Sequence, residues 1–243
     1  MEGRKLLQEK GLQILDEIGS GSFGKIFLVN HPSYGVIVAK VINNSDLYGN
    51  ENELRIIEIL KNDPPQTCPF IIRNYEYKQC EQQTIILMEH ANLGNLFDFI
   101  KASNNLSYST IRIIMKQLLL GLNYLHSKGI IHRDIKGQNI MLHSPPGSGI
   151  VLVKIGDYGE VKISEQNPFL SMRMSYKGTY GFMAPELFIP IVDAPKVSDE
   201  NGQMVPILNE AAIGDAKVDI WSIGILLYYI RTRKFPFRNP QNQ

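Results

Sequence analysis

Three residues of one short loop could together carry out chemistry: Asp134, Lys136 and Asn139. Asp134 can accept a proton, Lys136 can neutralise a developing negative charge, and Asn139 can offer an amide oxygen to a hard cation. Apolar segments enclose the loop, Leu118 to Leu125 before it and Ile140 to Leu142 after it. Polar side chains between core-forming segments are costly unless a site requires them. A base, a cation and a metal ligand in one loop indicate phosphoryl transfer.

A second candidate metal ligand, Asp157, stands 18 residues after Asn139. It follows a predicted strand that ends at Ile155, and an Asp-x-Gly sequence alone is more typical of an ordinary turn. A turn at residues 144–147 would bring this strand back beside the loop. Asp157 and Asn139 would then supply two oxygen ligands for Mg²⁺, which is bound by a few protein oxygens together with phosphates and water.

Glycines are spaced as G-x-G-x-x-G over residues 19–24. In a dinucleotide-binding fold this pattern is followed by a helix, whereas here Lys25 to Val29 predict a strand. The glycines therefore lie at the tip of a hairpin, where backbone N–H groups can approach phosphates. An ordinary flexible hairpin remains the alternative when this motif is considered alone.

Lys40 lies in a β-branched run over residues 36–42 that predicts a strand. A lysine in such a strand needs an ion pair or a bound anion, unless it protects an edge strand from aggregation. The helix predicted over residues 50–60 places Glu53 on its apolar face, toward the core. We therefore predict a Lys40–Glu53 ion pair, with Glu51, which lies off that face, as the alternative partner.

The composition is that of an ordinary globular protein. The 243 residues are 44% hydrophobic and 20% charged, enough for one large domain or two small ones. A net charge of +1 gives no reason to expect nucleic acid or an anionic membrane as the main partner. The two cysteines lack metal-type spacing, and the most apolar stretch, Ile220 to Ile230, is too short to span a bilayer. We expect an intracellular, cytoplasmic protein.

The hydrophobic pattern changes along the chain from strands to helices. Residues 12–42 read as strands and turns, and further strands are predicted over residues 71–77 and 84–88. The predicted helices cover residues 50–60, 96–102, 110–127 and 219–231. A strand-rich first third followed by helices predicts two lobes of α+β character.

Together these segments resemble the eukaryotic protein kinase family. The matches occur in the family's order and cover roughly residues 12–243: Gly19 to Ile26, Val38 to Lys40, Glu53, His132 to Asn139, Asp157 to Gly159, Ala184 to Glu186, and Asp219 to Ser222. The resemblance implies an α+β, bilobal protein kinase fold. A small antiparallel β-sheet N-lobe plus one helix would cover residues 12–88, with a hinge at 89–91. A mostly helical C-lobe would cover 92–243, and residues 1–11 would form a short N-terminal extension.

The resemblance also implies ATP and Mg²⁺ as cofactors and gives the residues roles. Lys40, oriented by Glu53, would contact the α- and β-phosphates, and Asn139 and Asp157 would hold Mg²⁺. Asp134 would accept the proton of the substrate hydroxyl, and Lys136 would stabilise the transferring group. The remaining nucleotide contacts would come from Ile18, Gly19, Ser20, Gly21, Ser22, Phe23, Gly24, Lys25, Ile26, Val38, the gatekeeper Met88, the backbones of Glu89 and Ala91, and Met141.

Lys136 and Thr179 are similar to the serine/threonine branch of the family, which implies a protein substrate with a serine or threonine acceptor. The loop from His132 is similar to that of Ste20-like kinases, but the subfamily stays unassigned. A regulatory phosphate on Ser175 would face Arg133 and Lys162, because these positions gather around such a phosphate in related kinases. The alternative is a solvated basic residue and an ordinary loop serine.

The chain departs from the family pattern at several places. Tyr158 replaces the commoner phenylalanine, and its hydroxyl needs a partner if it is buried. Residues 190–212 are predicted to be an inserted loop, either a docking element or a spacer. After the helix over 219–231 the family packs several more helices, so we expect a truncated C-lobe, a chain that is a fragment, and association through the uncovered apolar face.

Two other functions remain open at this point. The incomplete C-lobe is compatible with a pseudokinase-like scaffold or binding module, although every residue needed for chemistry is present. A small-molecule kinase is less compatible with Thr179 and with Ala184 to Glu186, which serve peptide binding in related enzymes. The sequence therefore favours an active protein serine/threonine kinase.

Overall fold

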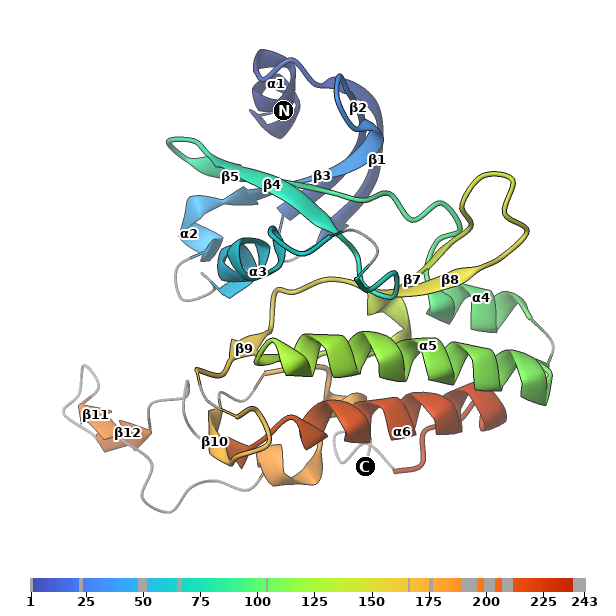
Figure 1. The fold of residues 1–243 in the computed structure, drawn as a ribbon. Coiled ribbons are helices and arrows are strands. Elements are labelled where there is room, and N and C mark those ends of the chain that lie inside the picture. Colours follow the sequence, from blue (N-terminus) through green and yellow to red (C-terminus); the bar gives the residue numbers. More distant parts are fainter. Residues whose placement is uncertain are drawn as a thin grey trace.

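The computed structural model describes residues 2–21, 24–47, 52–64, 67–103, 105–165, 167–174, 177–188, 196–198, 204–206 and 212–237. These residues form two lobes, a β-sheet lobe above and a largely helical lobe below (Figure 1). The α+β, bilobal architecture predicted from the sequence is therefore confirmed.

The N-lobe is built on a five-stranded antiparallel sheet. Its strand order is β1-β2-β3-β5-β4. The strands are β1 (Gln13–Gly21), β2 (Gly24–His31), β3 (Gly35–Asn43), β4 (Asn74–Gln79) and β5 (Gln83–Met88). The strand predicted over 71–77 starts later, because Ile71 forms a bridge with Ile155 of the other lobe instead of joining the sheet.

Helices cover both faces of this sheet. On one face α1 (Glu2–Glu9) packs Leu7 into a cluster with Phe27 and Val41. On the other face α2 (Asn44–Leu47) and α3 (Asn52–Leu60) pack in a second cluster. Residues 37–42 are consequently all buried, since neither side of the central strand β3 faces water. The polar side chain of Lys40 is thereby brought into the interior, next to α3.

The upper part of the C-lobe positions the loop that carries Asp134. Its helices are α4 (Leu96–Ala102) and α5 (Tyr108–Ser127), and each begins at a side-chain cap, from Asn95 and Ser107 respectively. Between α5 and the sheet lobe lie two short ladders, β6 (Ile130–Ile131) with β9 (Lys162–Ile163), and β7 (Ile140–His143) with β8 (Leu152–Ile155). A turn of 3₁₀ helix, η1 (Gly137–Asn139), links the loop to β7.

The lower part of the C-lobe is formed by α6 (Lys217–Thr232) and short elements packed on it. These are β10 (Met172–Met174) paired with β13 (Ala212–Gly214), and the turns η2 (Tyr180–Phe182) and η3 (Pro185–Phe188). The pair β11 (Lys196–Ser198) with β12 (Met204–Pro206) lies apart from α6, at the left of the lobe (Figure 1). The predicted inserted loop at 190–212 thus contains a two-stranded ladder. The other residues of that insertion, except Ala212, lie outside the described residues.

Apolar side chains are exposed along α6, as its sequence predicts. Ile220, Leu227 and Tyr228 are exposed, and Phe237 stacks on Trp221 at a centroid distance of 5.6 Å. Association through this face stays a prediction. Among the described residues, no helix is both long and apolar enough to cross a membrane.

Candidate active site

The backbone of the loop after β6 is fixed by one buried carboxylate. Asp219, at the start of α6, is 0% exposed. Its oxygens accept hydrogen bonds from the backbone N–H of His132 at 2.9 Å, from that of Arg133 at 2.7 Å, and from Nε2 of His126 at 2.8 Å. Arg133 has a φ of 65°, a conformation that a non-glycine residue keeps only when its surroundings hold it. Asp219 therefore holds the chain in the strained turn that presents Asp134.

The carboxylate of Asp134 is surrounded by hydrogen-bond donors. Oδ1 accepts from the Thr179 hydroxyl at 2.7 Å, and Oδ2 lies 2.7 Å from Nζ of Lys136 and 2.8 Å from Nδ2 of Asn139. Burial alone would raise the pKa of Asp134, but the hydrogen bonds from Lys136 and Thr179 outweigh it and lower the pKa below its ordinary value. Asp134 is thus held as a charged proton acceptor.

Lys136 and Thr179 also contact each other, because Nζ of Lys136 donates to Oγ1 of Thr179 at 2.8 Å. Thr179 lies in the segment before η2, 45 residues after Asp134. The three side chains form a closed triangle of polar contacts, which joins the segment before Ala184 to the loop. The structure brings these three predicted site residues together.

The predicted ion pair between Lys40 and Glu53 is present. Nζ of Lys40 lies 2.7 Å from Oε1 of Glu53 and 3.4 Å from Oδ1 of Asp157, and both Lys40 and Glu53 are buried. Burial by itself lowers the pKa of Lys40, yet the two carboxylates together raise it above its ordinary value. The alternative partner, Glu51, lies outside the described residues. Lys40 therefore stands as a stable cation between the two lobes.

Asn139 and Asp157 are brought near each other through the backbone. The N–H of Gly156 donates to the carbonyl of Asn139 at 2.9 Å, and the Gly156 carbonyl accepts from Nε2 of His132 at 3.0 Å. Nδ2 of Asn139 donates to Asp134, so the amide oxygen of Asn139 points away from Asp134. Asp157 keeps a side chain that is 40% exposed.

This donor set fits Mg²⁺ better than a metal held only by protein side chains. Among the described residues no three His, Cys, Asp or Glu side chains gather at one position. One amide oxygen and one carboxylate leave most positions of an octahedral ion to phosphates and water, which is the usual arrangement for Mg²⁺. Asn139 and Asp157 are the residues that would hold such an ion.

The glycine motif lies at the tip of the β1–β2 hairpin, as predicted. Gly19 pairs with Ile26, and Gly21 pairs with Gly24. Gly24 has a φ of +118°, and a Cβ there would lie 2.1 Å from the carbonyl oxygen of Val41, so no other residue fits. Ser22 and Phe23 lie outside the described residues.

The residues predicted to contact adenine come from both lobes and from the segment that joins them. Val38 pairs with Met88 across β3 and β5. The N–H of Glu89 donates to the carbonyl of Arg73 at 2.8 Å, which leaves the carbonyl of Glu89 as the group that could face a ligand. The remaining candidates differ in burial, because Ala91 is buried, Met141 is half-buried, and Ile18 is 47% exposed.

A model of the protein kinase domain family matches residues 12–243. The chain belongs to the protein kinase family. The match covers both lobes and begins just before β1, so of the elements described above only α1 precedes it. The kinase residues predicted from the sequence as catalytic or metal-binding therefore all fall within the matched region.

The chain is similar to several serine/threonine kinases. It is 31% identical over 239 residues to the human serine/threonine-protein kinase ULK1, covering 93% of this chain and 20% of that protein. It is 29% identical over 232 residues to the carbon catabolite-derepressing protein kinase of Candida glabrata, with coverages of 93% and 32%. It is also 29% identical over 231 residues to the serine/threonine-protein kinase cds1 of Schizosaccharomyces pombe, with coverages of 93% and 45%. The chain spans less than half the length of each of these relatives.

Tyr158, in the turn after Asp157, has the hydroxyl partners that its burial requires. Its OH donates to the carbonyl of Ile72 at 3.1 Å and to that of Ile155 at 3.2 Å. Burial raises the pKa of Tyr158, so the phenol stays protonated and can donate. The replacement of phenylalanine by tyrosine thus adds a link between the turn and the segment before β4.

The residues predicted to bind a regulatory phosphate are only partly described. Lys162 pairs with Ile131 at the start of the loop, one residue before His132. Nε of Arg133 donates to the carbonyl of Glu160 at 2.7 Å, and its Nη2 donates to that of Val161 at 3.3 Å. Ser175 lies outside the described residues, so its phosphorylation stays a prediction.

Sequence reasoning missed several residues that support this kinase site. Asp219 was predicted only as part of the segment Asp219 to Ser222, because nothing in its local sequence indicates that it accepts hydrogen bonds from a loop 86 and 87 positions away. Lys154, in the apolar strand β8, forms a buried ion pair with Glu89 at 2.9 Å and was not singled out. The sequence pattern around Lys154 resembles that around Lys40, because each lysine lies in an apolar strand that is expected to be buried.

Proposed function

We propose that this chain is an ATP-dependent protein kinase that transfers the γ-phosphoryl group of ATP to a serine or threonine hydroxyl of a protein. The observation that best supports this proposal is the environment of the Asp134 carboxylate, which Lys136, Thr179 and Asn139 hold in its charged form. A charged carboxylate at the end of a fixed loop is suited to orient a hydroxyl and accept its proton. Thr179, bonded to both Asp134 and Lys136, supports a serine or threonine acceptor.

In the proposed reaction, the hydroxyl oxygen of the acceptor attacks the γ-phosphorus and its proton passes to Asp134. The bond between the γ-phosphorus and the oxygen of the leaving ADP breaks as the new oxygen–phosphorus bond forms. Lys136 lies 2.7 Å from Asp134, so its ammonium group is positioned to stabilise the negative charge of the transferring group.

On the nucleotide side, Lys40 would contact the α- and β-phosphates while Glu53 keeps its ammonium group in place. Mg²⁺ held by Asn139 and Asp157 would neutralise charge on the phosphates. The glycine hairpin would cover the phosphates with its backbone N–H groups. Nothing in the described residues favours the binding-module alternative.

The test is phosphoryl transfer from γ-labelled ATP to a generic basic protein, with wild type compared with Asp134→Asn. Loss of the general base should lower the rate about 10²- to 10⁴-fold. ATP affinity and the unfolding temperature should stay close to wild type, because the amide keeps the size of the carboxylate. Phosphoamino-acid analysis should show phosphoserine or phosphothreonine. Equal transfer by the two proteins, or label on tyrosine alone, would contradict the proposal.

A further inference from the structure

Helix α1 lies outside the residues that match the kinase family, yet it is part of the N-lobe core. The match begins at Leu12, whereas α1 covers Glu2–Glu9. Leu7 is 0% exposed, and the N–H of Leu12 donates to its carbonyl at 3.0 Å. Gly3 is so close to the sheet that an added Cβ would lie 3.4 Å from Cγ1 of Val41. The helix is therefore fixed on the sheet and is not a loose extension.

One side chain of α1 contacts the hairpin that carries the glycine motif. The guanidinium of Arg4 donates from Nε and Nη2 to Oε2 of Glu17, at 3.3 Å and 3.2 Å. It also lies over the ring of Phe27, 5.6 Å from the centroid. Glu17 and Phe27 are directly opposite each other on β1 and β2. Arg4 thus contacts both strands of the hairpin at one register position.

This contact lies beside one of the two register shifts in the hairpin. The register between β1 and β2 shifts between Glu17 and Gly19, which marks a bulge at the base of the glycine motif. Beyond it, Oε1 of Glu17 lies 3.8 Å from Nζ of Lys25, the residue next to Gly24. Arg4, Glu17 and Lys25 therefore form a line of alternating charge from α1 to the end of the motif.

We propose that Arg4 is a positioning residue for ATP, which acts through Glu17 and Phe27 to hold the glycine hairpin over the phosphates. This inference rests on the proposed function. β1 is an edge strand of the sheet, hydrogen-bonded to β2, so its position also depends on the side chains that pack against it. Arg4 provides such a contact from outside the nucleotide site. The Arg4 and Glu17 side chains are 52% and 30% exposed, so the effect on binding is expected to be moderate.

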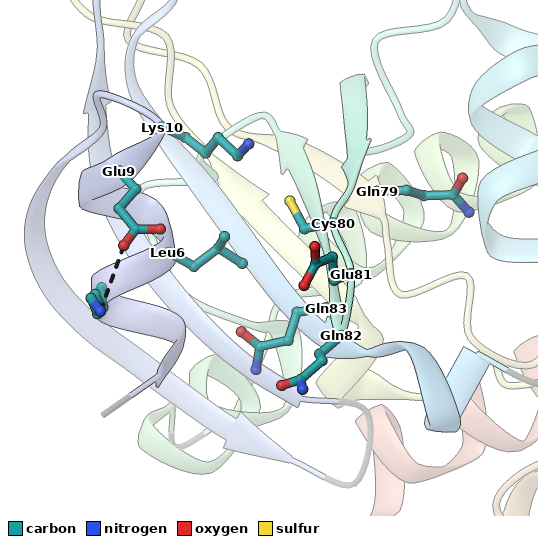
Figure 2. Close-up of a pocket in the computed structure, with 9 residues that line it drawn as sticks. Leu6, Glu9, Lys10, Gln79, Cys80, Glu81, Gln82 and Gln83 are labelled. Carbon is teal, nitrogen blue, oxygen red and sulfur yellow. Dashed lines mark ion pairs between the residues drawn. The ribbon is translucent and has the colours of Figure 1, made fainter.

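A neighbouring side of α1 provides a matched control. A groove lies between α1 and the turn that joins β4 to β5, with Leu6 and Glu9 of the helix on one side of it (Figure 2). Its volume is about 630 Å³. Lys5 lies on this side, and its Nζ is 3.8 Å from Oε1 of Glu9, within the same helix. Lys5→Gln removes one positive charge from α1, as Arg4→Gln does, but the ion pair that it breaks does not reach the glycine hairpin.

The experiment measures kcat and the KM for ATP of Arg4→Gln, Glu17→Gln, the double variant and Lys5→Gln in the whole chain. Arg4→Gln should raise the KM for ATP about three-fold with kcat unchanged, the size expected of a partly exposed ion pair with a cation–π contact. Adding Arg4→Gln to Glu17→Gln should raise the KM less than Arg4→Gln does in wild type, because the ion pair is already lost and only the contact with Phe27 remains to be removed. Lys5→Gln should leave the KM unchanged.

Direct titration of ATP binding separates this inference from the proposed function. If wild type shows no transfer that depends on Asp134, the proposed function fails, but weaker ATP binding by Arg4→Gln would still support the positioning role. The inference is overturned if Arg4→Gln changes ATP affinity no more than Lys5→Gln does. It is also overturned if Arg4→Gln lowers only kcat or the unfolding temperature.

Discussion

The loop from His132 to Asn139 and the cluster of Lys40, Glu53 and Asp157 (the Lys40 cluster) are held in place by different means. In the loop, Asp219 accepts three hydrogen bonds from Arg133, His132 and His126, and all four residues belong to one lobe and are buried. In the Lys40 cluster, Nζ of Lys40 on β3 lies 2.7 Å from Oε1 of Glu53 on α3, within the N-lobe. The same Nζ lies 3.4 Å from Oδ1 of Asp157, which belongs to the C-lobe. The conformation of the loop is therefore fixed by contacts within one lobe, whereas the geometry of the Lys40 cluster depends on the relative position of the two lobes.

This difference teaches that the two regions should respond differently to substitution. Removing a fixing residue of the loop should leave buried donors without an acceptor and affect the whole fold. Removing one carboxylate partner of Lys40 should leave the other carboxylate in place, so the rate of phosphoryl transfer should fall only in part. The predictions below test this contrast, from the largest expected effect to the smallest.

Asp219→Ala should have the largest effect. It leaves the backbone N–H groups of His132 and Arg133 buried without their acceptor, at a cost of about 1–3 kcal/mol each. The free energy of unfolding should fall by about 3–5 kcal/mol, with loss of activity at temperatures where wild type works. Urea unfolding followed by circular dichroism measures this. Glu165→Ala, at a side chain that is 85% exposed, is the control and should change the value by less than about 0.5 kcal/mol. Equal losses in the two variants would contradict the contrast.

Glu53→Gln should act mainly on the rate. The amide keeps the size of the side chain but removes the charge that lies 2.7 Å from Lys40, while Asp157 remains at 3.4 Å. We expect kcat/KM to fall about 10- to 100-fold, with a smaller loss of stability than in Asp219→Ala. Initial-rate kinetics over a range of ATP concentrations measures this, with the exposed Glu58→Gln on the same helix as the control. We take about two-fold as the limit of assay error. If the kcat/KM of Glu53→Gln lies within that range of wild type, Asp157 alone is enough to position Lys40.

The sequence predicted those parts of the site that depend on local patterns. The periodicity of residues 50–60 placed Glu53 on the inner face of α3, and the pattern of β3 required a partner for Lys40, so their ion pair could be predicted. The hairpin around the glycine motif followed in the same way from the strand after Gly24. Helix 96–102 was predicted with its observed bounds from its hydrophobic pattern, and in the structure Asn95 caps its first turn.

What could not be predicted depends on contacts between distant residues. Asp219 accepts from His132 across 87 positions, and no local pattern reveals which acid will fix a loop so far away. The late start of β4 has the same cause, since the backbone N–H of Ile72 donates to the carbonyl of Ile155 in the other lobe. Residues 1–11 were expected to be a short extension, because the packing of Leu7 is visible only once the face of the sheet is known.

Thr179→Val should sharpen the contrast within the catalytic loop itself. Valine keeps the shape of threonine but cannot donate to Oδ1 of Asp134, which now accepts from the hydroxyl at 2.7 Å. We expect kcat to fall about ten-fold, the effect of one hydrogen bond to a charged group. Thr179→Ser keeps the hydroxyl and is the matched control.

The dependence on pH separates the loss of this hydrogen bond from a change in packing. Burial raises the pKa of Asp134, while the bonds from Lys136 and Thr179 lower it below the ordinary value of 3.8. A lowered pKa in the folded state adds stability above the ordinary pKa, and this stability is lost as the pH falls through the folded pKa. Without the Thr179 hydroxyl the pKa of Asp134 should rise, so the acidic limbs of both kcat and stability should move to higher pH. In Thr179→Ser they should stay with wild type. If the acidic limb of Thr179→Val does not move, Lys136 and Asn139 keep Asp134 charged without the Thr179 hydroxyl, and this prediction is wrong.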